Sequence, residues 1–205
     1  GMGTIAPNPL YTEEKQRECM GKIFLPTIKA MEKEGRPFKG CLYFGLMLTP
    51  KGAKVIEYNC RFGDPETQVV LPLLKTDLVD IMEAVWEERL ADLEVEWSSD
   101  SCACVVMASG GYPEKYETGK EISGLDEKGQ HKGFYVYHAG TKLGDYAAEK
   151  RAAYLTSGGR VLGLTATDKT LQGALDKAYG AVREISFENA HYRTDIGKRS
   201  LNEKQ

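Results

Sequence analysis

The sequence lacks several features that mark particular classes of protein. No run of apolar residues approaches the ~18 that would cross a membrane, and the N-terminus shows no charged segment followed by an apolar core, so no secretory signal is visible. A basic excess is also absent, because 27 Lys and Arg stand against 30 Asp and Glu, for a net charge of −3. Nucleic-acid-binding domains usually carry positive charge. We therefore expect a soluble, cytoplasmic protein that binds neither membranes nor nucleic acids.

The five cysteines lack the paired spacing of a zinc knuckle. Cys102 and Cys104 lie two apart in an apolar run, so on a strand their side chains would point to the same side. Half of a zinc or redox site is one interpretation. We favour buried thiols in a reducing compartment, because no second pair follows and the three histidines are scattered.

The length of 205 residues suits one large domain or two of roughly 100 residues each. The hydrophobic fraction of 41% is ordinary for a globular protein and argues against wholesale disorder. Residues 92–101 are acidic and rich in serine, and we interpret them as the boundary between two parts. The expected domains are therefore 1–98 and 99–205.

The first part predicts helices beside an antiparallel hairpin. Thr12 should cap a helix whose apolar residues recur at helical spacing, and Pro26 should bend or split that helix. The other expected segments are an irregular stretch over 1–10, a hairpin formed by 39–49 and 54–60, and a second helix over about 77–91 that starts near Asp77.

The second part of the sequence has a different pattern of apolar residues and glycines. Short apolar runs at 102–108, 134–139 and 160–166 are separated by glycine-rich turns, which favours a small barrel or sandwich. One helix interrupts them over 168–185, capped by Thr167 or Asp168. We interpret His138, which lies in an apolar strand, as a hydrogen-bonded structural residue, and Gly110-Gly111 as a turn.

The residues that could carry chemistry lie on the second strand of the hairpin. Side chains alternate along a strand, so Glu57 and Asn59 share one face, and Arg61 joins them if the strand persists. Carboxylate and amide oxygens are hard donors that suit Mg²⁺, and an arginine can hold phosphate with its planar fork. Metal-bridged phosphates beside an arginine suit phosphoryl transfer. The spacing alone also fits a solvated strand face.

The longer string from Val55 to Gln68 closely resembles the metal-binding segment of glycinamide ribonucleotide synthetases, the phosphoribosylamine–glycine ligases of purine biosynthesis. Tyr58 replaces a phenylalanine that is more usual there, but it faces away from the metal side. Other segments resemble the same family: the end of its glycine-rich loop at Gly1-Met2-Gly3, the preceding strand at 39–47, and C-terminal-domain motifs at 108–113, 138–141, 158–162 and 193–197.

The resemblance implies an α+β protein of the ATP-grasp superfamily. The rear lobe of the ATP-grasp domain, an antiparallel sheet with helices, would occupy 1–98. A small β-rich, barrel- or sandwich-like domain with one main helix would occupy 99–205. The implied reaction is ATP-dependent: glycine's carboxylate is phosphorylated, and the amine of phosphoribosylamine then attacks the glycyl phosphate, which leaves ADP, phosphate and the amide.

The roles of individual residues are carried over from the same resemblance. Glu57 and Asn59 would ligate Mg²⁺, with Mn²⁺ as a plausible substitute, and Arg61 would hold the transferred phosphate of ATP. Asp64 would orient the amine or the glycine ammonium. A simple turn at Asp64 and Pro65 is an equally good interpretation.

Nothing in the chain resembles the N-terminal half of the family, so we expect a match to the C-terminal half of the enzyme. Because half of the nucleotide site would then be missing, we expect the chain alone to be inactive or very weak. Two alternatives stay open: a lobe of another ATP-grasp ligase or carboxylase, and a non-catalytic module that docks on a separate N-terminal half.

Overall fold

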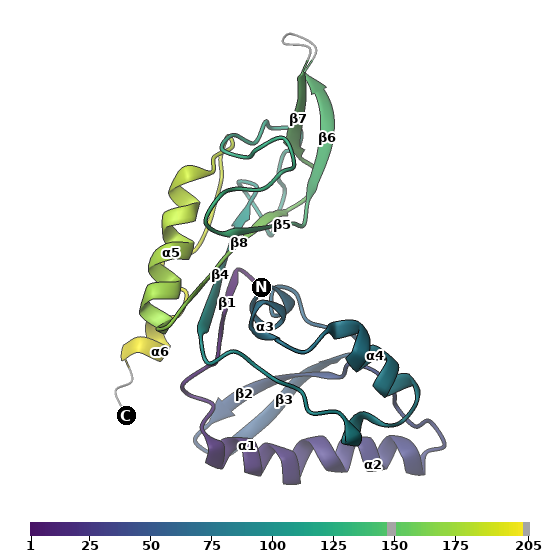
Figure 1. Ribbon diagram of the computed structural model, residues 1–205. Coiled ribbons are helices and arrows are strands. Elements are labelled where there is room, and N and C mark those ends of the chain that lie inside the picture. Colours follow the sequence, from purple (N-terminus) through teal and green to yellow (C-terminus); the bar gives the residue numbers. More distant parts are fainter. Residues whose placement is uncertain (147–150, 203–205) are drawn as a thin grey trace. The chain divides into compact units, whose positions relative to one another are not determined.

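The computed structural model describes residues 1–146 and 151–202, which divide into two compact units (Figure 1). We call Asn8–Gly63 with Leu74–Ser98 the hairpin unit, and Gly1–Pro7, Asp64–Leu73 and Ser99–Gln205 together the sheet unit. The chain thus passes between the units four times, at 7/8, 63/64, 73/74 and 98/99. The expected domain boundary at 98/99 concerns the family's domains and stays a prediction.

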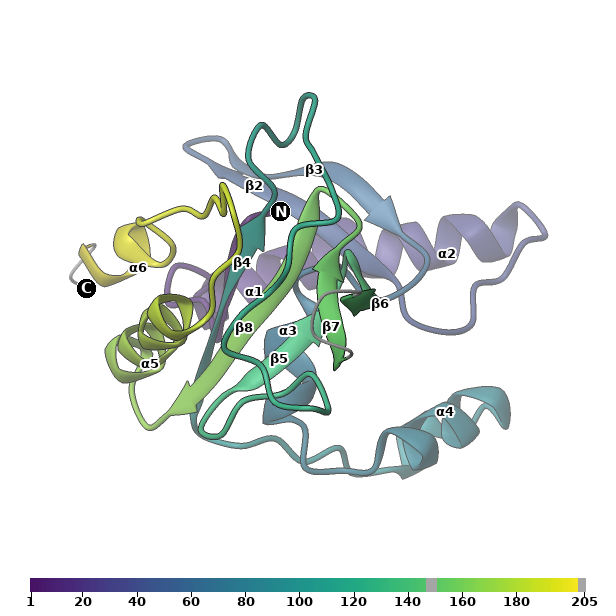
Figure 2. The same cartoon turned by 90° about the horizontal axis from the view of Figure 1, so that it is seen from above.

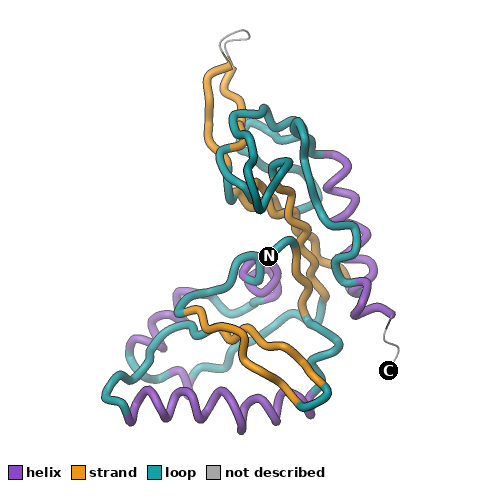
Figure 3. Tube along the Cα trace, turned by 180° about the vertical axis from the view of Figure 1, so that it is seen from behind, coloured by secondary structure: helices purple, strands orange, loops and turns teal. Residues whose placement is uncertain are grey.

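The hairpin unit contains helices around two paired strands. Its elements are α1 (Glu13–Cys19), the π-helix η1 (Met20–Phe24), α2 (Leu25–Lys33), β2 (Tyr43–Thr49), β3 (Gly52–Asn59), α4 (Leu78–Trp86) and the 3₁₀ turn η3 (Leu90–Asp92). Strands β2 and β3 pair antiparallel, as expected, with Tyr43 opposite Asn59 and Thr49 opposite Gly52. They lie over the helical run α1–α2 (Figure 3), where the rings of Phe24 and Phe44 are 4.5 Å apart.

The ends of these helices follow local backbone chemistry. The Thr12 side chain accepts a hydrogen bond from the backbone N–H of Lys15 at 3.4 Å, which confirms the predicted cap. Pro26 lies in the first turn of α2, directly after the π-helix. The chain stays helical from Glu13 to Lys33, so the helix is not split there, and a bend at Pro26 stays a prediction. The prediction that the second helix reaches residue 91 was wrong: α4 ends at Trp86, and Glu88 has a φ of 59°, which no helix accommodates.

The sheet unit is built on a four-stranded antiparallel sheet in the order β1-β4-β8-β5. Its strands are β1 (Gly3–Ala6), β4 (Ser101–Ala108), β5 (Tyr135–His138) and β8 (Arg160–Asp168). A separate hairpin, β6 (Thr141–Tyr146) with β7 (Arg151–Thr156), completes the strands. The helical segments are α3 (Thr67–Val70), the 3₁₀ turn η2 (Leu71–Leu73), α5 (Leu171–Glu184) and α6 (Lys198–Asn202). Figure 2 shows β4, β8 and β5 side by side.

This arrangement of helices and antiparallel sheets agrees with the expected α+β class. It corrects the prediction made for residues 1–10. The expected barrel- or sandwich-like domain takes the form of the four-stranded sheet, the β6–β7 hairpin and the main helix α5. The prediction that residues 1–10 are irregular was wrong, because Gly3–Ala6 forms β1 and pairs with β4, Gly3 lying opposite Val105. A four-residue strand whose partner is about a hundred residues away leaves no local signal of pairing.

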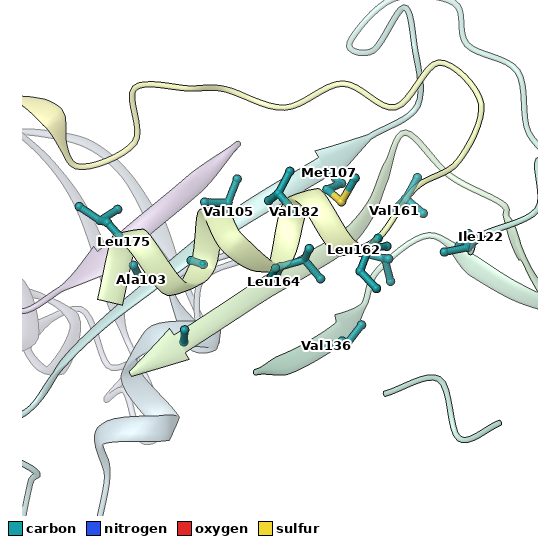
Figure 4. Close-up of a cluster of buried hydrophobic side chains, with 14 of the residues drawn as sticks. Ala103, Val105, Met107, Ile122, Val136, Val161, Leu162, Leu164, Leu175 and Val182 are labelled. Atoms are coloured by element: carbon teal, nitrogen blue, oxygen red, sulfur yellow. The ribbon is translucent and has the colours of Figure 1, made fainter. Parts of the chain in front are cut away.

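The core of the sheet unit lies between the sheet and α5. Alternation along β4 sends Ala103, Val105 and Met107 toward α5, where they join a buried apolar cluster (Figure 4). From the helix, Leu175 and Val182 pack into the same cluster. The cap of α5 is Thr170, whose side chain accepts from the N–H of Gly173 at 3.0 Å, and not Thr167 or Asp168 as expected, because β8 runs through Asp168.

The opposite face of β4 holds the cysteine pair. Cys102, Cys104 and Val106 form a second buried cluster with Val69 of α3 and Leu73 of η2. Both thiols are fully buried, and burial raises the pKa of Cys102 and of Cys104 to about 12. The interpretation of buried thiols is therefore confirmed. In the described residues, no helix is both long and apolar enough to cross a membrane.

Candidate functional site

The predicted metal ligands lie at the end of β3 in the hairpin unit. Glu57 is exposed and Asn59, the last residue of the strand, is half-buried. The two residues are separated by one position, so they share a strand face as expected. Arg61 lies beyond the strand, and its Nη1 donates to the carbonyl oxygen of Phe62 at 2.7 Å. The strand therefore does not persist to Arg61, and its face cannot be assigned by alternation.

The cross-strand neighbours distinguish the two faces of this hairpin. Tyr58 pairs with Phe44, and their rings meet edge to face with centroids 5.3 Å apart. Glu57 pairs with Gly45 of β2, and a Cβ built on Gly45 would lie 2.8 Å from Cγ of Glu57. The Glu57 side chain therefore passes directly over the glycine. Tyr58 lies on the aromatic face, away from Glu57, as the sequence predicted.

The donor set fits a hard divalent cation. Glu57 offers a carboxylate and Asn59 an amide oxygen, and both are ligands that Mg²⁺ accepts. In the described part of the chain, no three His, Cys, Asp or Glu side chains gather into a metal-binding group. Two protein ligands leave coordination positions for other oxygens, such as those of water or phosphate, which is the usual situation for Mg²⁺.

Asp64 belongs to the sheet unit, where it is held at three points. Its Oδ1 accepts from Nε2 of Gln68 at 3.0 Å, and its Oδ2 accepts from Nη2 of Arg160 at 3.0 Å. Nη1 of Arg160 also donates to the backbone carbonyl oxygens of Asp64, at 2.9 Å, and of Gly1, at 3.0 Å. Arg160 thus joins the N-terminal segment, the Asp64–Pro65 turn and the start of β8.

Arg160 has a role that sequence reasoning did not find. It appears in the Gly158-Gly159-Arg160 motif, which shows no local sign of a charge partner. His138, by contrast, is placed as expected: its Nδ1 lies 2.8 Å from Oγ1 of Thr141 and its Nε2 lies 2.7 Å from the carbonyl oxygen of Gly129. Both ring nitrogens are engaged within the fold. Gly111 has a φ of 96° in a turn, which confirms the turn expected at Gly110-Gly111.

Comparison with known proteins places this fold in a class. Residues 1–67 match the family model described as the phosphoribosylglycinamide synthetase ATP-grasp (A) domain. The biotin carboxylase domain of Hydrogenobacter thermophilus 2-oxoglutarate carboxylase, solved with ADP and magnesium, superposes with a TM-score of 0.53 at 18% identity, over 93% of this chain and 40% of that one. The fold is that of an ATP-grasp protein.

Two closer similarities define the family. A second family model, the phosphoribosylglycinamide synthetase C domain, matches residues 102–199. The phosphoribosylamine–glycine ligase of Caldanaerobacter subterraneus subsp. tengcongensis is 48% identical over 96% of this chain. The solved phosphoribosylamine–glycine ligase of Thermotoga maritima has a TM-score of 0.72 at 35% identity over 96% of this chain. The chain belongs to the phosphoribosylglycinamide synthetase family.

The match covers part of each relative. The alignment spans 45% of the Caldanaerobacter enzyme and 46% of the Thermotoga chain, so this chain spans about half the length of the relatives it matches. Matches to the A and C domains agree with the expected correspondence to the C-terminal half of the enzyme. The 48% identity is to a ligase, whereas the likeness to the biotin carboxylase domain, at 18% identity, is one of fold.

Proposed function

We propose that this chain forms part of an ATP-dependent ligase that joins glycine to 5-phosphoribosylamine in purine biosynthesis. The observation that carries the proposal is the 48% identity to a phosphoribosylamine–glycine ligase across 96% of the chain. In the proposed reaction, ATP phosphorylates the glycine carboxylate, and the amine of phosphoribosylamine displaces phosphate from the glycyl phosphate. ADP and phosphate are released. A cytoplasmic location is part of the same proposal.

The residues of the hairpin unit would serve the phosphoryl-transfer step. Glu57 and Asn59 would hold Mg²⁺, or Mn²⁺ in its place, because they supply hard oxygen donors at the end of one strand. When bound, the cation would neutralise charge on the phosphate oxygens. Arg61 would hold the transferred phosphate, because its Nη1 donates to the Phe62 carbonyl oxygen and its other N–H groups remain as donors.

Asp64 is proposed to orient the amine of a substrate. Its carboxylate accepts hydrogen bonds from Gln68 and Arg160, and these fix its direction while each oxygen keeps a second lone pair. An ammonium group could be received by those lone pairs. The turn interpretation is compatible with this role, since the Asp64–Pro65 turn is what places the carboxylate beside Arg160.

The proposal requires a partner, namely the rest of the enzyme. The relatives are about twice as long as this chain, and positioning of ATP and substrates supplies much of an enzyme's rate. We therefore expect the 205-residue polypeptide alone to show no turnover with ATP, Mg²⁺, glycine and phosphoribosylamine. Fusion to the remaining part of the Caldanaerobacter ligase should produce ADP only when both glycine and phosphoribosylamine are present.

The fused enzyme also tests the metal site. Glu57→Gln should lower kcat/KM by about 100-fold or more, because a cation at the transferring phosphate contributes several kcal/mol and each 1.36 kcal/mol is a factor of ten. Glu32→Gln is the matched control, because Glu32 is exposed on α2. Equal rates for Glu57→Gln and Glu32→Gln would exclude Glu57 as a ligand. A fused protein without turnover would favour the non-catalytic module.

A further inference from the structure

Gly45 is an unusual residue for its position. It lies inside β2 and is buried, although a glycine in a strand interior loses backbone entropy and has no side chain to pack. Its φ is outside the left-handed region that favours glycine, so the backbone conformation does not require it. The register of β2 and β3 shifts between Gly45 and Leu46, and an irregularity of this kind is often occupied by a glycine. The side chain that lies against Gly45 gives a second, separate reason for a glycine.

The neighbour that excludes a side chain at Gly45 is Glu57. A Cβ at Gly45 would lie 2.8 Å from Cγ of Glu57 and 3.6 Å from its backbone nitrogen and oxygen. Carbon atoms in good contact are about 3.5–4.0 Å apart, so the first distance is a clash and the other two are ordinary contacts. Only the Glu57 side chain would have to move, by rotation about its Cα–Cβ bond.

We propose that Gly45 is a positioning residue for the Glu57 carboxylate. The space left by the missing side chain makes room for the observed direction of the Glu57 side chain, which a Cβ at position 45 would block, and this keeps the carboxylate available for the cation that it shares with Asn59. The inference rests on the proposed metal-binding role of Glu57. A larger residue at 45 leaves the hairpin intact but turns the carboxylate away.

Binding of Mn²⁺ to the isotope-labelled 205-residue polypeptide tests this inference without an activity assay. Mn²⁺ broadens the NMR signals of nearby amides, and a titration of that broadening yields a dissociation constant. Gly45→Ala should weaken Mn²⁺ binding on the order of tenfold or more, the range seen when a residue that orients a metal ligand is changed. Gly21→Ala is the matched control, because a Cβ there meets nothing within 4 Å.

The outcomes separate the inference from the metal site. The metal site is supported if Mn²⁺ broadens the amide signals of Glu57 and Asn59 and if Glu57→Gln abolishes binding. If Gly45→Ala then binds Mn²⁺ like the unchanged chain, the role of Gly45 is overturned. If the unchanged chain shows no such broadening, or if Glu57→Gln binds Mn²⁺ equally well, the proposed metal site is overturned. The role of Gly45 is then overturned as well. Binding weakened by Gly45→Ala but unaffected by Gly21→Ala supports the inference.

A second measurement needs no variant and holds even if Gly45→Ala fails to fold. Three-bond couplings from the backbone nitrogen and carbonyl carbon to Cγ of Glu57 report the rotamer of that side chain. The inference expects the χ1 rotamer that lies over Gly45 to be the main one in the unchanged polypeptide. Couplings that show this rotamer to be little populated would overturn the inference, because the space at Gly45 would then have no bearing on the carboxylate.

Discussion

Side chains at neighbouring positions of one strand have different contacts in this protein. On β3, Glu57 lies over Gly45 while the adjacent Tyr58 packs edge to face on Phe44. On β4, Val105 faces α5 while Cys104 faces α3 and η2. A strand period of two residues is therefore sufficient to separate a candidate ligand from a packing residue.

Arg160 is the residue whose loss should disturb the sheet unit most among the polar side chains discussed above. Arg160→Met removes its hydrogen bonds to Gly1 and Asp64 and leaves the Asp64 carboxylate with Gln68. Because both side chains are partly exposed, solvent screens the pair, and we expect a loss of about 1–2 kcal/mol in the free energy of unfolding. Urea denaturation followed by circular dichroism measures it.

Two further variants define the cause of that loss. Arg160→Lys keeps the positive charge but loses the planar, two-pronged guanidinium. Its free energy of unfolding should therefore lie between that of Arg160→Met and that of the unchanged chain. Arg193→Met removes an exposed ion pair with Asp195 and should change stability less. If Arg160→Met were as stable as Arg193→Met, the contacts of Arg160 would be structurally neutral.

The sequence predicts some of these residues and not others, for reasons of chain separation. Glu57, Asn59 and Tyr58 lie on one strand, so alternation assigns their faces from local sequence. The partners of Arg160 lie 96 and 159 residues away, and no local period reports such a contact. The metal and substrate roles of Glu57, Asn59, Arg61 and Asp64 stay predictions.

Element ends in this protein are decided by single polar groups. The sequence located α5 from its period but misplaced its cap, because Asp168 and Thr170 both suit a helix start. In the structure, Asp168 ends β8, and its Oδ1 accepts from the backbone N–H of Thr170 at 3.1 Å. Its Oδ2 lies 2.7 Å from Nζ of Lys177, one and a half turns into the helix.

This arrangement predicts a pH dependence for the junction between β8 and α5. The hydrogen bond from Lys177, followed by that from the Thr170 N–H, lowers the pKa of Asp168 below its ordinary 3.8. A lowered folded-state pKa means that the charged carboxylate stabilises the fold above about pH 4, and that this contribution is lost as the pH falls through the folded-state pKa. Asp168→Asn should therefore be less stable than the unchanged chain at pH 7.

The stability difference should shrink at low pH. Unfolding free energies of both proteins, measured by urea denaturation at pH 7, 5 and 3, give the difference at each pH. We expect similar differences at pH 7 and 5 and a smaller one at pH 3. A difference that stays constant to pH 3 would show that the Asp168 charge contributes nothing to the junction.

The whole molecule has two units whose segments alternate along the chain. The sheet unit takes three segments, and two of them, Gly1–Pro7 and Asp64–Leu73, precede residue 98. These segments supply β1 beside β4 and, in α3 and η2, the cover for Cys102 and Cys104. A cut at 98/99 would remove both from the sheet that they complete.

Thiol chemistry can test this dependence. Residues 99–205 contain two cysteines, Cys102 and Cys104, which are fully buried in the whole chain. In the isolated segment the Val69 and Leu73 cover is gone, so burial no longer holds both thiols neutral and both should react with a disulfide reagent at pH 8 within minutes.

The whole chain supplies the comparison for this experiment. Its Cys60 is exposed and should react, whereas Cys102 and Cys104 should react only after denaturant is added. Modified peptides identified by mass spectrometry distinguish the sites. The thiols of the 99–205 segment could also stay as protected as those of the whole chain. This result would mean that the segment folds completely without residues 1–7 and 64–73.

The pairing of β1 with β4 also sets an order of events during synthesis on the ribosome. Gly3 lies opposite Val105, so β1 waits for about a hundred further residues before its partner strand β4 has been made. At roughly 5–20 residues per second this interval is about 5–20 seconds. The hairpin β2–β3, whose strands are adjacent in sequence, can close within that interval. Until β4 has been made, the backbone groups of β1 that pair with it in the folded chain have no such partner.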